Sequence, residues 1–566
     1  MKKSNKIIAA ALSALMVVPY AAACNGGGGI GGGTQIDSNK TQLNIGVYDG
    51  GTGVDYAYAL AKSFEERYKG ISFEEGKTGV QVKIIPARYD GGLEFDIAEL
   101  NVDVFMGTAA NANYLAAKGL LADITDVYES PMAYDFVTGE TDPNGSMTLL
   151  KDKIRVDLVD YYQNDETLKS YGFPGTTTYY GLVYDMDLFE EANLYFAKNG
   201  GFVTSATDER SAGPDGNYET AYDNGLPATY DDFFALCDKM VSINVTPVMW
   251  GGTVQEYVNS LLTALAADCD GKEQTELNYN YEGVATTLIA SFDGDKPVLA
   301  PAEEITAQTG YKLYNTQGRY YALQFLERLL SNPKYYNSAD ATNTALDHTM
   351  AQDMYLLSKY GDVRQRTAML VEGNWWQKEA LGTFQAMEAE NGEEDSVYTR
   401  RFGMLPLPKP TQEKVGEPFT LLERCVGDGF INGNIADYKL NLAKSFVQFI
   451  FSDASCKMEL EINGMARPAD FDIGDAYDSL TPWGKTSYDL AKNAVMASMY
   501  SESKIMQNYA SQLWYSPNLW LSKVGGTTYT YPTKAMIDNK VTGKAYFTGL
   551  QNYWTESVWS SKFTAI

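Results

Sequence analysis

The chain has 566 residues, 45% of them hydrophobic, and 73 acidic against 45 basic side chains give a formal net charge of −28. This length supports two large lobes with separate cores. The acidic balance argues against nucleic acid as a partner, since phosphate binding needs clustered Lys and Arg. His348 is the single histidine, which removes ordinary His-based zinc sites and Ser-His or Cys-His nucleophiles. No catalytic residue, metal or cofactor is predicted.

The chain begins with an export signal. A basic start and an apolar stretch too short to span a bilayer precede Ala21-Ala22-Ala23-Cys24, which resembles a bacterial lipobox, although Ala21 stands where a branched apolar residue is usual. We expect residues 1–23 to be a lipoprotein signal peptide and Cys24 to carry the lipid that attaches the protein to the membrane. Residues 24–40 then form a Gly-rich tether. Plain secretory cleavage is the alternative.

The first ordered elements indicate an α/β unit. A strand at Leu43–Tyr48 is followed by a glycine-rich break, a helix over residues 58–68 and a second strand over residues 80–85. Open α/β sheets bind ligands beyond the carboxyl ends of their strands, which places Tyr48 and Asp49 at a candidate site. The glycines match neither GxGxxG nor a P-loop, so nucleotide binding is not indicated.

The next elements lead to a crossing between two lobes. A short buried strand over residues 103–107 includes Met106, and a helix follows it. Farther along, Pro174-Gly175 is a turn signal, and a β-branched and aromatic run over residues 176–184 predicts a strand that leaves one lobe and enters the other. Of its adjacent tyrosines, Tyr179 and Tyr180, at least one ring is expected to face the space between the lobes. Ordinary strand packing is the alternative.

Several fragments, in order along the chain, resemble the extracellular solute-binding proteins of carbohydrate ABC importers, the broad family that includes maltose-binding protein. They are DVFMG with AAKGLLADITDVY, FPGTTTYYGLVYDMDLF, PATYDDFFALCDKM, AMLVEGNWW, RFGMLPLPKP, and AKSFVQFIFSD with INGMARPADFD. The resemblance implies an α/β, two-lobed periplasmic-binding-protein-like fold of type II, whose discontinuous lobes are joined by hinge crossings. We expect residues 41–176 plus about 428–475 in lobe 1, and residues 177–427 plus about 476–566 in lobe 2.

Tryptophans are the strongest site candidates. A flat aromatic ring covers the apolar C–H face of a sugar while polar neighbours bond its hydroxyls. Trp375 and Trp376 are adjacent, and adjacent strand residues point to opposite faces, so one indole can face the cleft while the other packs inward. The resemblance makes Trp375 the first choice and Trp376 the second. The pair could instead begin a helix after the Gly-Asn turn. Trp250 lies in a loop that contributes an aromatic residue in similar proteins, and a local core position is its alternative.

Polar candidates lie near the return crossing. The stretch over residues 419–431 resembles the segment that returns the chain to lobe 1, and it carries Arg424 and Asp428. Arg467 resembles a position beside the sugar site. Arginine suits hydroxyl recognition through its fixed fork of donors. For each of these side chains a surface salt bridge is the alternative.

The cysteines, three expected insertions and the C-terminal region each allow more than one interpretation. Four cysteines allow three complete pairings, with buried free thiols equally possible; they are Cys237, Cys269, Cys425 and Cys456. Residues 200–226, 267–301 and 334–360 are expected insertions. In the first of them, a solvated acidic loop is favoured over a Ca²⁺ site. The aromatic C-terminal region could either extend the cleft or form helical cores.

The predicted function is binding without chemistry. A surface-anchored, monomeric protein captures a saccharide, closes around it and delivers it to the permease subunits of an ABC importer. The glycine tether suggests a Gram-positive surface. A peptide or another polar solute is the alternative ligand, and a cell-surface glycoside hydrolase, which needs two facing carboxylates, is the rival class.

Overall fold

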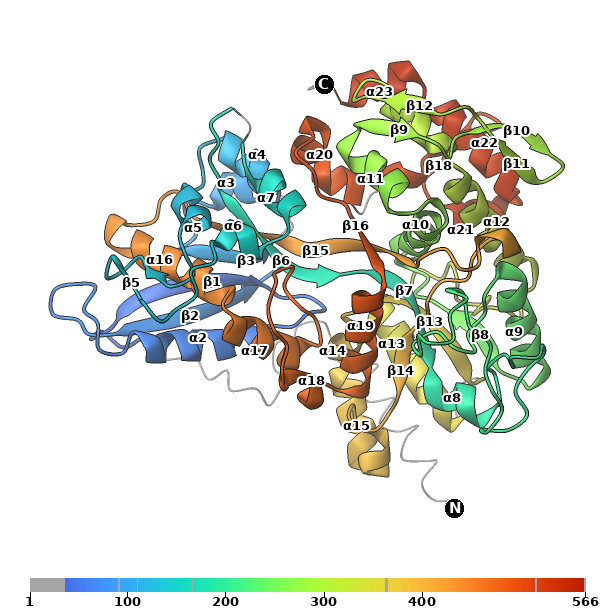
Figure 1. Ribbon diagram of the computed structural model, residues 1–566, viewed down its shortest axis with the longest axis horizontal. Helices are drawn as coiled ribbons and strands as arrows, with labels where there is room; N and C mark the ends of the chain where they lie inside the picture. Colours follow the sequence, from blue (N-terminus) through green and yellow to red (C-terminus); the bar gives the residue numbers. More distant parts are fainter. Residues whose placement is uncertain are drawn as a thin grey trace.

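The computed structural model describes residues 36–89, 92–108, 110–164, 166–361, 365–514 and 517–563. The expectations for the signal peptide, Cys24 and most of the tether lie outside these residues. Two lobes are visible side by side in Figure 1, with strands β6 and β15 running between them. Each lobe contains one central sheet covered by helices, which is the predicted α/β class.

Lobe 1 is built on a mostly buried sheet. Its strands are β1 (Thr41–Tyr48), β2 (Val80–Ala87), β3 (Val104–Thr108), β6 (Gly172–Thr178) and β15 (Thr420–Ile431). A sixth strand from the C-terminal part of the chain, β16 (Val495–Ser498), extends the sheet by pairing in parallel with β15. β1 pairs in parallel with β2 and β3, whereas β15 runs antiparallel to both β3 and β6. Leu43, Ile45 and Val47 of β1 are fully buried. This burial is typical of a parallel strand with helices on both faces.

Helices cover both faces of this sheet in Figure 1, with α2 and α17 below it and α3, α4 and α7 above. Phe64 of α2 meets Phe446 of α16 edge to face, with ring centroids 5.2 Å apart. The helices of lobe 1 are α2 (Asp55–Arg67), α3 (Leu93–Asp96), α4 (Ala112–Ala117), α5 (Thr125–Glu129), α6 (Leu150–Lys153), α7 (Val156–Tyr162), α16 (Asp437–Ile450) and α17 (Asp453–Asn463). A short hairpin, β4 (Tyr134–Asp135) with β5 (Glu140–Thr141), lies among them.

Lobe 2 contains a smaller sheet in the order β14-β7-β13-β8. Its strands are β7 (Tyr180–Asp185), β8 (Thr246–Met249), β13 (Thr367–Gly373) and β14 (Phe402–Met404). β7 is antiparallel to its two neighbours, and β13 is parallel to β8. The helices around it are α8 (Met186–Glu191), α9 (Tyr230–Ser242), α10 (Glu256–Asp270), α12 (Gln317–Ser331), α13 (His348–Leu357), α14 (Trp376–Glu379), α15 (Leu381–Asn391), α18 (Ala476–Ser479) and α19 (Pro482–Asn493).

Two helices of lobe 2 begin at side chains that cap their first turn. The Asp185 carboxylate accepts a hydrogen bond from the Leu188 amide and begins α8. Thr229 begins α9 with a reciprocal capping box to Asp232. Such caps satisfy backbone N–H groups that have no partner inside the helix.

The remaining chain adds a second layer to lobe 2. Its elements are α11 (Lys272–Asn280), β9 (Gly283–Ala285), β10 (Ile289–Asp293), β11 (Lys296–Leu299), β12 (Glu303–Ile305), α20 (Lys504–Trp514), β17 (Ser522–Val524), β18 (Thr527–Tyr529), α21 (Pro532–Asn539), α22 (Gly543–Tyr553) and α23 (Glu556–Lys562). Trp520, Trp554 and Trp559 are buried here. The helical-core alternative therefore holds for Trp520.

The C-terminal segment also touches lobe 1. Gln507 of α20 donates to the Tyr161 carbonyl (3.4 Å) and its own carbonyl accepts from Asn111 (2.6 Å). The rings of Tyr161 and Tyr500 meet edge to face at 4.9 Å. This segment therefore bridges the lobes beside α4 and α7.

The first crossing differs from the single strand predicted over residues 176–184. Tyr179 separates β6 from β7 because its backbone bonds to a side chain and to an amide of another segment. Its N–H donates to Asn374 Oδ1 (3.3 Å), and its carbonyl accepts from the Asn374 amide (3.1 Å). The crossing is thereby fixed to the turn that precedes Trp375.

Cys237, Cys269 and Cys456 are buried free thiols, so the free-thiol alternative holds for these three. The side chain of Cys425 lies outside the part of the structure that is described. Within the described ranges, no helix combines the length and apolarity needed to cross a bilayer.

Candidate ligand-binding site between the lobes

Trp375 lies where lobe 2 meets lobe 1. It comes one residue after Asn374, which follows the end of β13, and it is the N-cap of α14, so the helix alternative for the Trp375-Trp376 pair holds. The facing segment of lobe 1 is the glycine loop after β1. A Cβ atom added to Gly51 would lie 2.4 Å from Cδ1 of the Trp375 indole, so only glycine allows this approach. Lys378, one turn farther, pairs with Asp55 of α2 at 2.7 Å.

Asn374 holds the Trp375 turn in place. Besides its two bonds with Tyr179, its side-chain amide donates to the Thr177 carbonyl (3.3 Å). Its own carbonyl accepts from the indole N–H of Trp483 (3.1 Å). Because Thr177 and Tyr179 belong to the crossing, the position of Trp375 is tied to the hinge. A movement of the hinge will therefore move the indole relative to lobe 1.

Aromatic rings surround Trp375 on its lobe 2 side. Tyr180 meets it edge to face, with centroids 4.9 Å apart and an interplanar angle of 88°. Tyr257 of α10 lies 6.3 Å from it and stacks on His348 at 5.6 Å. Trp375 is only 8% exposed in this arrangement. Contacts from both lobes thus leave little of the indole exposed.

The lobe 1 side contains three of the predicted residues. Tyr48, Met106 and Arg467 line one small cavity at the carboxyl ends of β1 and β3, together with Thr52, Tyr56, Gly107, Phe173, Gly175 and Thr176. Asp49 is exposed on the glycine loop beside this cavity. The strand ends therefore bring these residues together, as expected for an open α/β sheet, and a ligand contact by any of the four stays a prediction.

Arg467 is fixed by a buried partner. Its Nε lies 2.6 Å from Oε2 of Glu459, and both side chains are almost fully buried. Glu459 also accepts a hydrogen bond from Thr176 (2.6 Å), and Arg467 donates to the Pro174 carbonyl (3.3 Å). The surface salt bridge named as its alternative is wrong, because the pair is internal. Arg467 holds β6 against α17 while it lines the cavity.

Two predicted tryptophans pack in the interior of lobe 2. Trp376 is fully buried and contacts the rings of Tyr355, Phe384, Phe402 and Trp483. Trp250 is also fully buried; it stacks on Tyr336 at 5.3 Å and donates its indole N–H to the Ala341 carbonyl (3.0 Å). Both are corrected to core positions, because hydrophobic packing takes up their rings.

Two residues of the crossings hold the structure together. The Asp428 carboxylate accepts from the Ala112 amide and from the Tyr162 hydroxyl, both at 2.7 Å, and burial raises its pKa to about 6. The Tyr179 hydroxyl donates to the Ser487 carbonyl at 3.2 Å, and its ring is buried. Both side chains are buried and bonded within the protein. This corrects their assignment as ligand contacts.

Arg424 is buried within the hinge ladder. It pairs with Thr178 of β6, whose hydroxyl donates to the Arg424 carbonyl at 2.8 Å. Its charge also lowers the pKa of Asp428, opposing the larger effect of burial. A ligand contact by Arg424 stays a prediction.

Several residues of this site have no signal in the sequence that would single them out. Tyr257, Glu372 and Glu379 are ordinary members of helices and a strand, and His348 stands out only as the single histidine. Burial and the neighbouring Glu379 raise the pKa of Glu372 to about 8. The Glu379 hydrogen bond raises the pKa of His348. Tertiary contact alone brings them behind Trp375.

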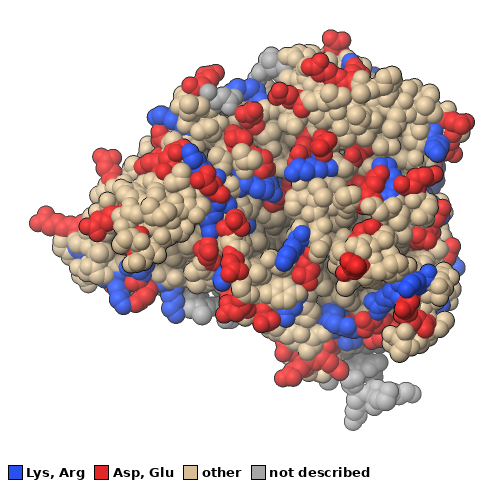
Figure 2. Space-filling model, in the orientation of Figure 1, with Lys and Arg blue, Asp and Glu red and all other residues tan. Residues whose placement is uncertain are grey.

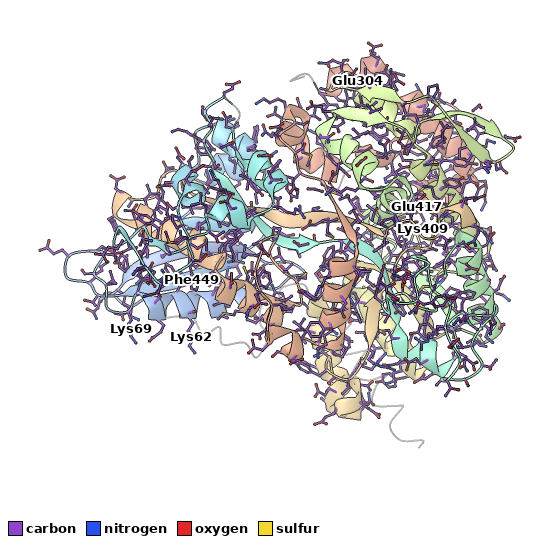
Figure 3. The ribbon with its side chains drawn as sticks, in the orientation of Figure 1. Lys62, Lys69, Glu304, Lys409, Glu417 and Phe449 are labelled. Atoms are coloured by element: carbon purple, nitrogen blue, oxygen red, sulfur yellow. The ribbon has the colours of Figure 1, made fainter. Side chains whose placement is uncertain are left out.

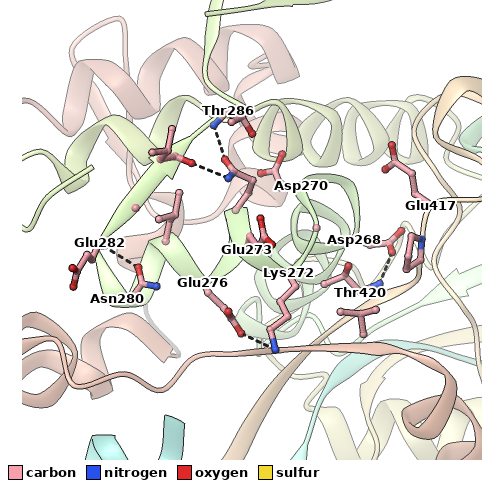
Figure 4. Close-up of a pocket in the computed structure, with 17 residues that line it drawn as sticks. Asp268, Asp270, Lys272, Glu273, Glu276, Asn280, Glu282, Thr286, Glu417 and Thr420 are labelled. Carbon is pink, nitrogen blue, oxygen red and sulfur yellow. Dashed lines mark hydrogen bonds and ion pairs between the residues drawn. The ribbon is translucent and has the colours of Figure 1, made fainter. Parts of the chain in front are cut away.

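A larger hollow lies apart from the contact between Trp375 and Gly51. Figure 4 shows it between α10, α11 and the start of β15, lined by Asp268, Asp270, Glu273, Glu276, Glu282 and Glu417 among others. Asp268 is engaged by Lys409 (2.8 Å) and by the Thr420 amide (2.9 Å), and Lys409 and Glu417 are labelled near α10 in Figure 3. In the described residues, no group of three or more acidic, His or Cys side chains is arranged to hold a metal ion.

The charged surface is mixed on the face shown in Figure 2. Lys and Arg side chains are interspersed with Asp and Glu over both lobes on this face.

The fold and the site define a two-lobed binding protein whose ligand would lie between the lobes. The chain belongs to the family of bacterial extracellular solute-binding proteins, whose model matches residues 59–458. The family places the protein outside the cytoplasm. A search among curated proteins gives no significant match.

Solved structures show the same fold. A chitin oligosaccharide binding protein superposes with a TM-score of 0.54 at 14% identity, covering 92% of this chain and 100% of that one. The solute-binding protein RafE in complex with raffinose superposes with a TM-score of 0.50 at 13% identity, covering 91% and 100%. At these identities the likeness concerns the fold.

Proposed function

We propose that the protein captures a saccharide between its lobes and delivers it to the permease of an ABC importer. The observation that carries this proposal is the indole of Trp375 at the interlobe contact, held by the hinge and accompanied by Tyr180, Tyr257 and Glu379. An aromatic face beside polar acceptors is the combination that recognises the C–H faces and hydroxyls of a sugar. Two proteins of similar fold are described as binding chitin oligosaccharide and raffinose.

The mechanism is a hinge closure. A saccharide enters the open form, lies on Trp375 and is enclosed as the glycine loop of lobe 1 approaches. The ligand shifts the equilibrium only through its greater affinity for the closed form. Lipid on Cys24 holds the protein at the membrane, and a monomer in its closed form docks on the permease. Residues Tyr48, Asp49, Met106 and Arg467 form the opposite wall.

Calorimetric titration of the mature chain, beginning after Cys24, tests this function. A panel of mono- and oligosaccharides is compared with a panel of short peptides and other polar solutes. We expect binding to at least one saccharide and its loss in Trp375→Ala. Binding only to a peptide or another solute would contradict the saccharide assignment. New reducing ends after incubation with polysaccharides would instead indicate a hydrolase.

A further inference from the structure

Glu379 places a carboxylate beside the indole of Trp375. The Glu379 amide donates to the Trp375 carbonyl at 3.1 Å, so both side chains extend from the same turn of α14. A Cβ atom at Gly51 would lie 3.2 Å from Glu379 Oε1, against 2.4 Å from the indole. The same glycine loop of lobe 1 therefore faces the aromatic ring and the carboxylate together.

Two neighbours orient this carboxylate and leave part of it free to accept. Gln352 donates to Glu379 Oε2 at 2.6 Å, and Nε2 of His348 lies 3.3 Å from Oε1. A carboxylate has about four lone-pair sites, so these two contacts do not use its full acceptor capacity. The Glu379 side chain is 15% exposed, which places it at the margin of the site rather than inside the core.

Glu372 shares the Gln352 amide with Glu379 but is more deeply buried. Glu372 is fully buried, accepts from Gln352 (3.0 Å) and from the Gly373 amide (2.9 Å), and keeps its proton at neutral pH because burial raises its pKa to about 8. The amide of Gln352 therefore bridges a buried carboxyl group to one at the margin. Of the two carboxyl groups, only that of Glu379 is partly exposed.

We propose that Glu379 is a ligand-contacting residue that accepts hydrogen bonds from hydroxyl groups of the solute lying on Trp375. Gln352 and His348 are its positioning residues. The proposal deepens the proposed function and rests on it: it assigns the ligand class as one with a hydroxyl next to an apolar ring face. A solute without such a hydroxyl loses this contact.

The test uses the saccharide that binds the mature chain best, and its deoxy analogues. Titrations compare the wild type with Glu379→Gln, which keeps the shape of the side chain, and with Glu390→Gln on the exposed surface of α15 as matched control. Thermal unfolding of each variant confirms that it is folded. Loss of a hydrogen bond to a charged group lowers affinity by about tenfold or more.

We expect Glu379→Gln to lower the affinity for the saccharide by about tenfold. The control Glu390→Gln should have the same affinity as the wild type. One deoxy analogue should bind wild type and Glu379→Gln equally, because the group that contacts Glu379 is gone; a residue with a merely structural role would weaken every analogue alike. Equal binding of the intact saccharide by Glu379→Gln and wild type would overturn the proposal, while the saccharide function stands. Absence of saccharide binding by the wild type would overturn both.

Discussion

Gly51 of lobe 1 packs directly against the indole of Trp375 in lobe 2, so closely that a Cβ atom there would lie 2.4 Å from Cδ1 of the ring. We predict that Gly51→Val holds the lobes apart. If the closed form becomes tenfold rarer, the apparent affinity for ligand falls about tenfold. Titration calorimetry and the radius of gyration from X-ray scattering measure the two effects.

The matched control is Gly70→Val. Gly70 is exposed, and nothing lies within 4 Å of a Cβ atom there. This variant should bind as the wild type does. Equal affinity of Gly51→Val and Gly70→Val would show that the Gly51 contact is not needed for closure.

The ion pair between Lys378 and Asp55 crosses from one lobe to the other at 2.7 Å, with Lys378 13% and Asp55 61% exposed. Because one partner is largely in water, the pair contributes at most about 1 kcal/mol to closure. Lys378→Met should therefore lower ligand affinity by less than about fivefold. The difference from wild type should shrink as salt is raised from about 0.05 to 0.5 M, since salt screens exposed charges. A large effect that persists at high salt would contradict this account.

Glu372 makes stability depend on pH. Its pKa rises from 4.5 to about 8 through burial. The stability that its bound proton gives the folded state is therefore fully present below pH 4.5 and is lost as pH rises through 8. Urea unfolding at pH 5, 6.5 and 8 should show the wild type losing stability over this window more steeply than Glu372→Gln. Other buried carboxyl groups, such as Asp428, contribute equally to both proteins. Identical slopes for the two proteins would rule out a proton on Glu372.

The Arg467–Glu459 pair stabilises lobe 1 from inside. Arg467→Met leaves the buried Glu459 without its partner, which should cost about 3–5 kcal/mol of the free energy of unfolding. The double variant Arg467→Met with Glu459→Gln should recover much of this loss, because no unpaired charge is left. Urea denaturation of the single and double variants measures both. If Arg467→Met is as stable as the wild type, the Arg467–Glu459 pair does not stabilise lobe 1.

The predictions for Trp375 and Trp376 show how much of the site the sequence could indicate. Adjacent indoles predicted that one faces the cleft and one packs inward, and Trp376 does pack inward. The order of choice between them came from the resemblance. The same resemblance predicted that Trp250 contacts the ligand. Its ring instead stacks on Tyr336 and its indole N–H bonds to the Ala341 carbonyl, inside lobe 2. Aromatic residues at strand ends serve either purpose, and only their neighbours decide which.

The polar residues of the site were harder to predict. Tyr48, Asp49 and Met106 were predicted because strand ends in an open α/β sheet face the ligand crevice, and their contact with a ligand stays a prediction. Asp428 was misassigned, since its carboxylate caps the chain at Ala112 and bonds to Tyr162, both far from it in sequence. Glu379 and His348 come from α14 and α13 and meet only after the lobe folds.

The sequence by itself determined the α/β class, the strand-helix order of lobe 1 and the family, because these depend on local periodicity and on fragments in a fixed order. The tertiary structure decided which aromatic and charged side chains share one space. The approach of Gly51 to Trp375 and the chain of hydrogen bonds through Gln352 join segments about three hundred and about twenty residues apart. No local pattern records such contacts, since they follow from how the lobes pack and where the hinge lets them meet.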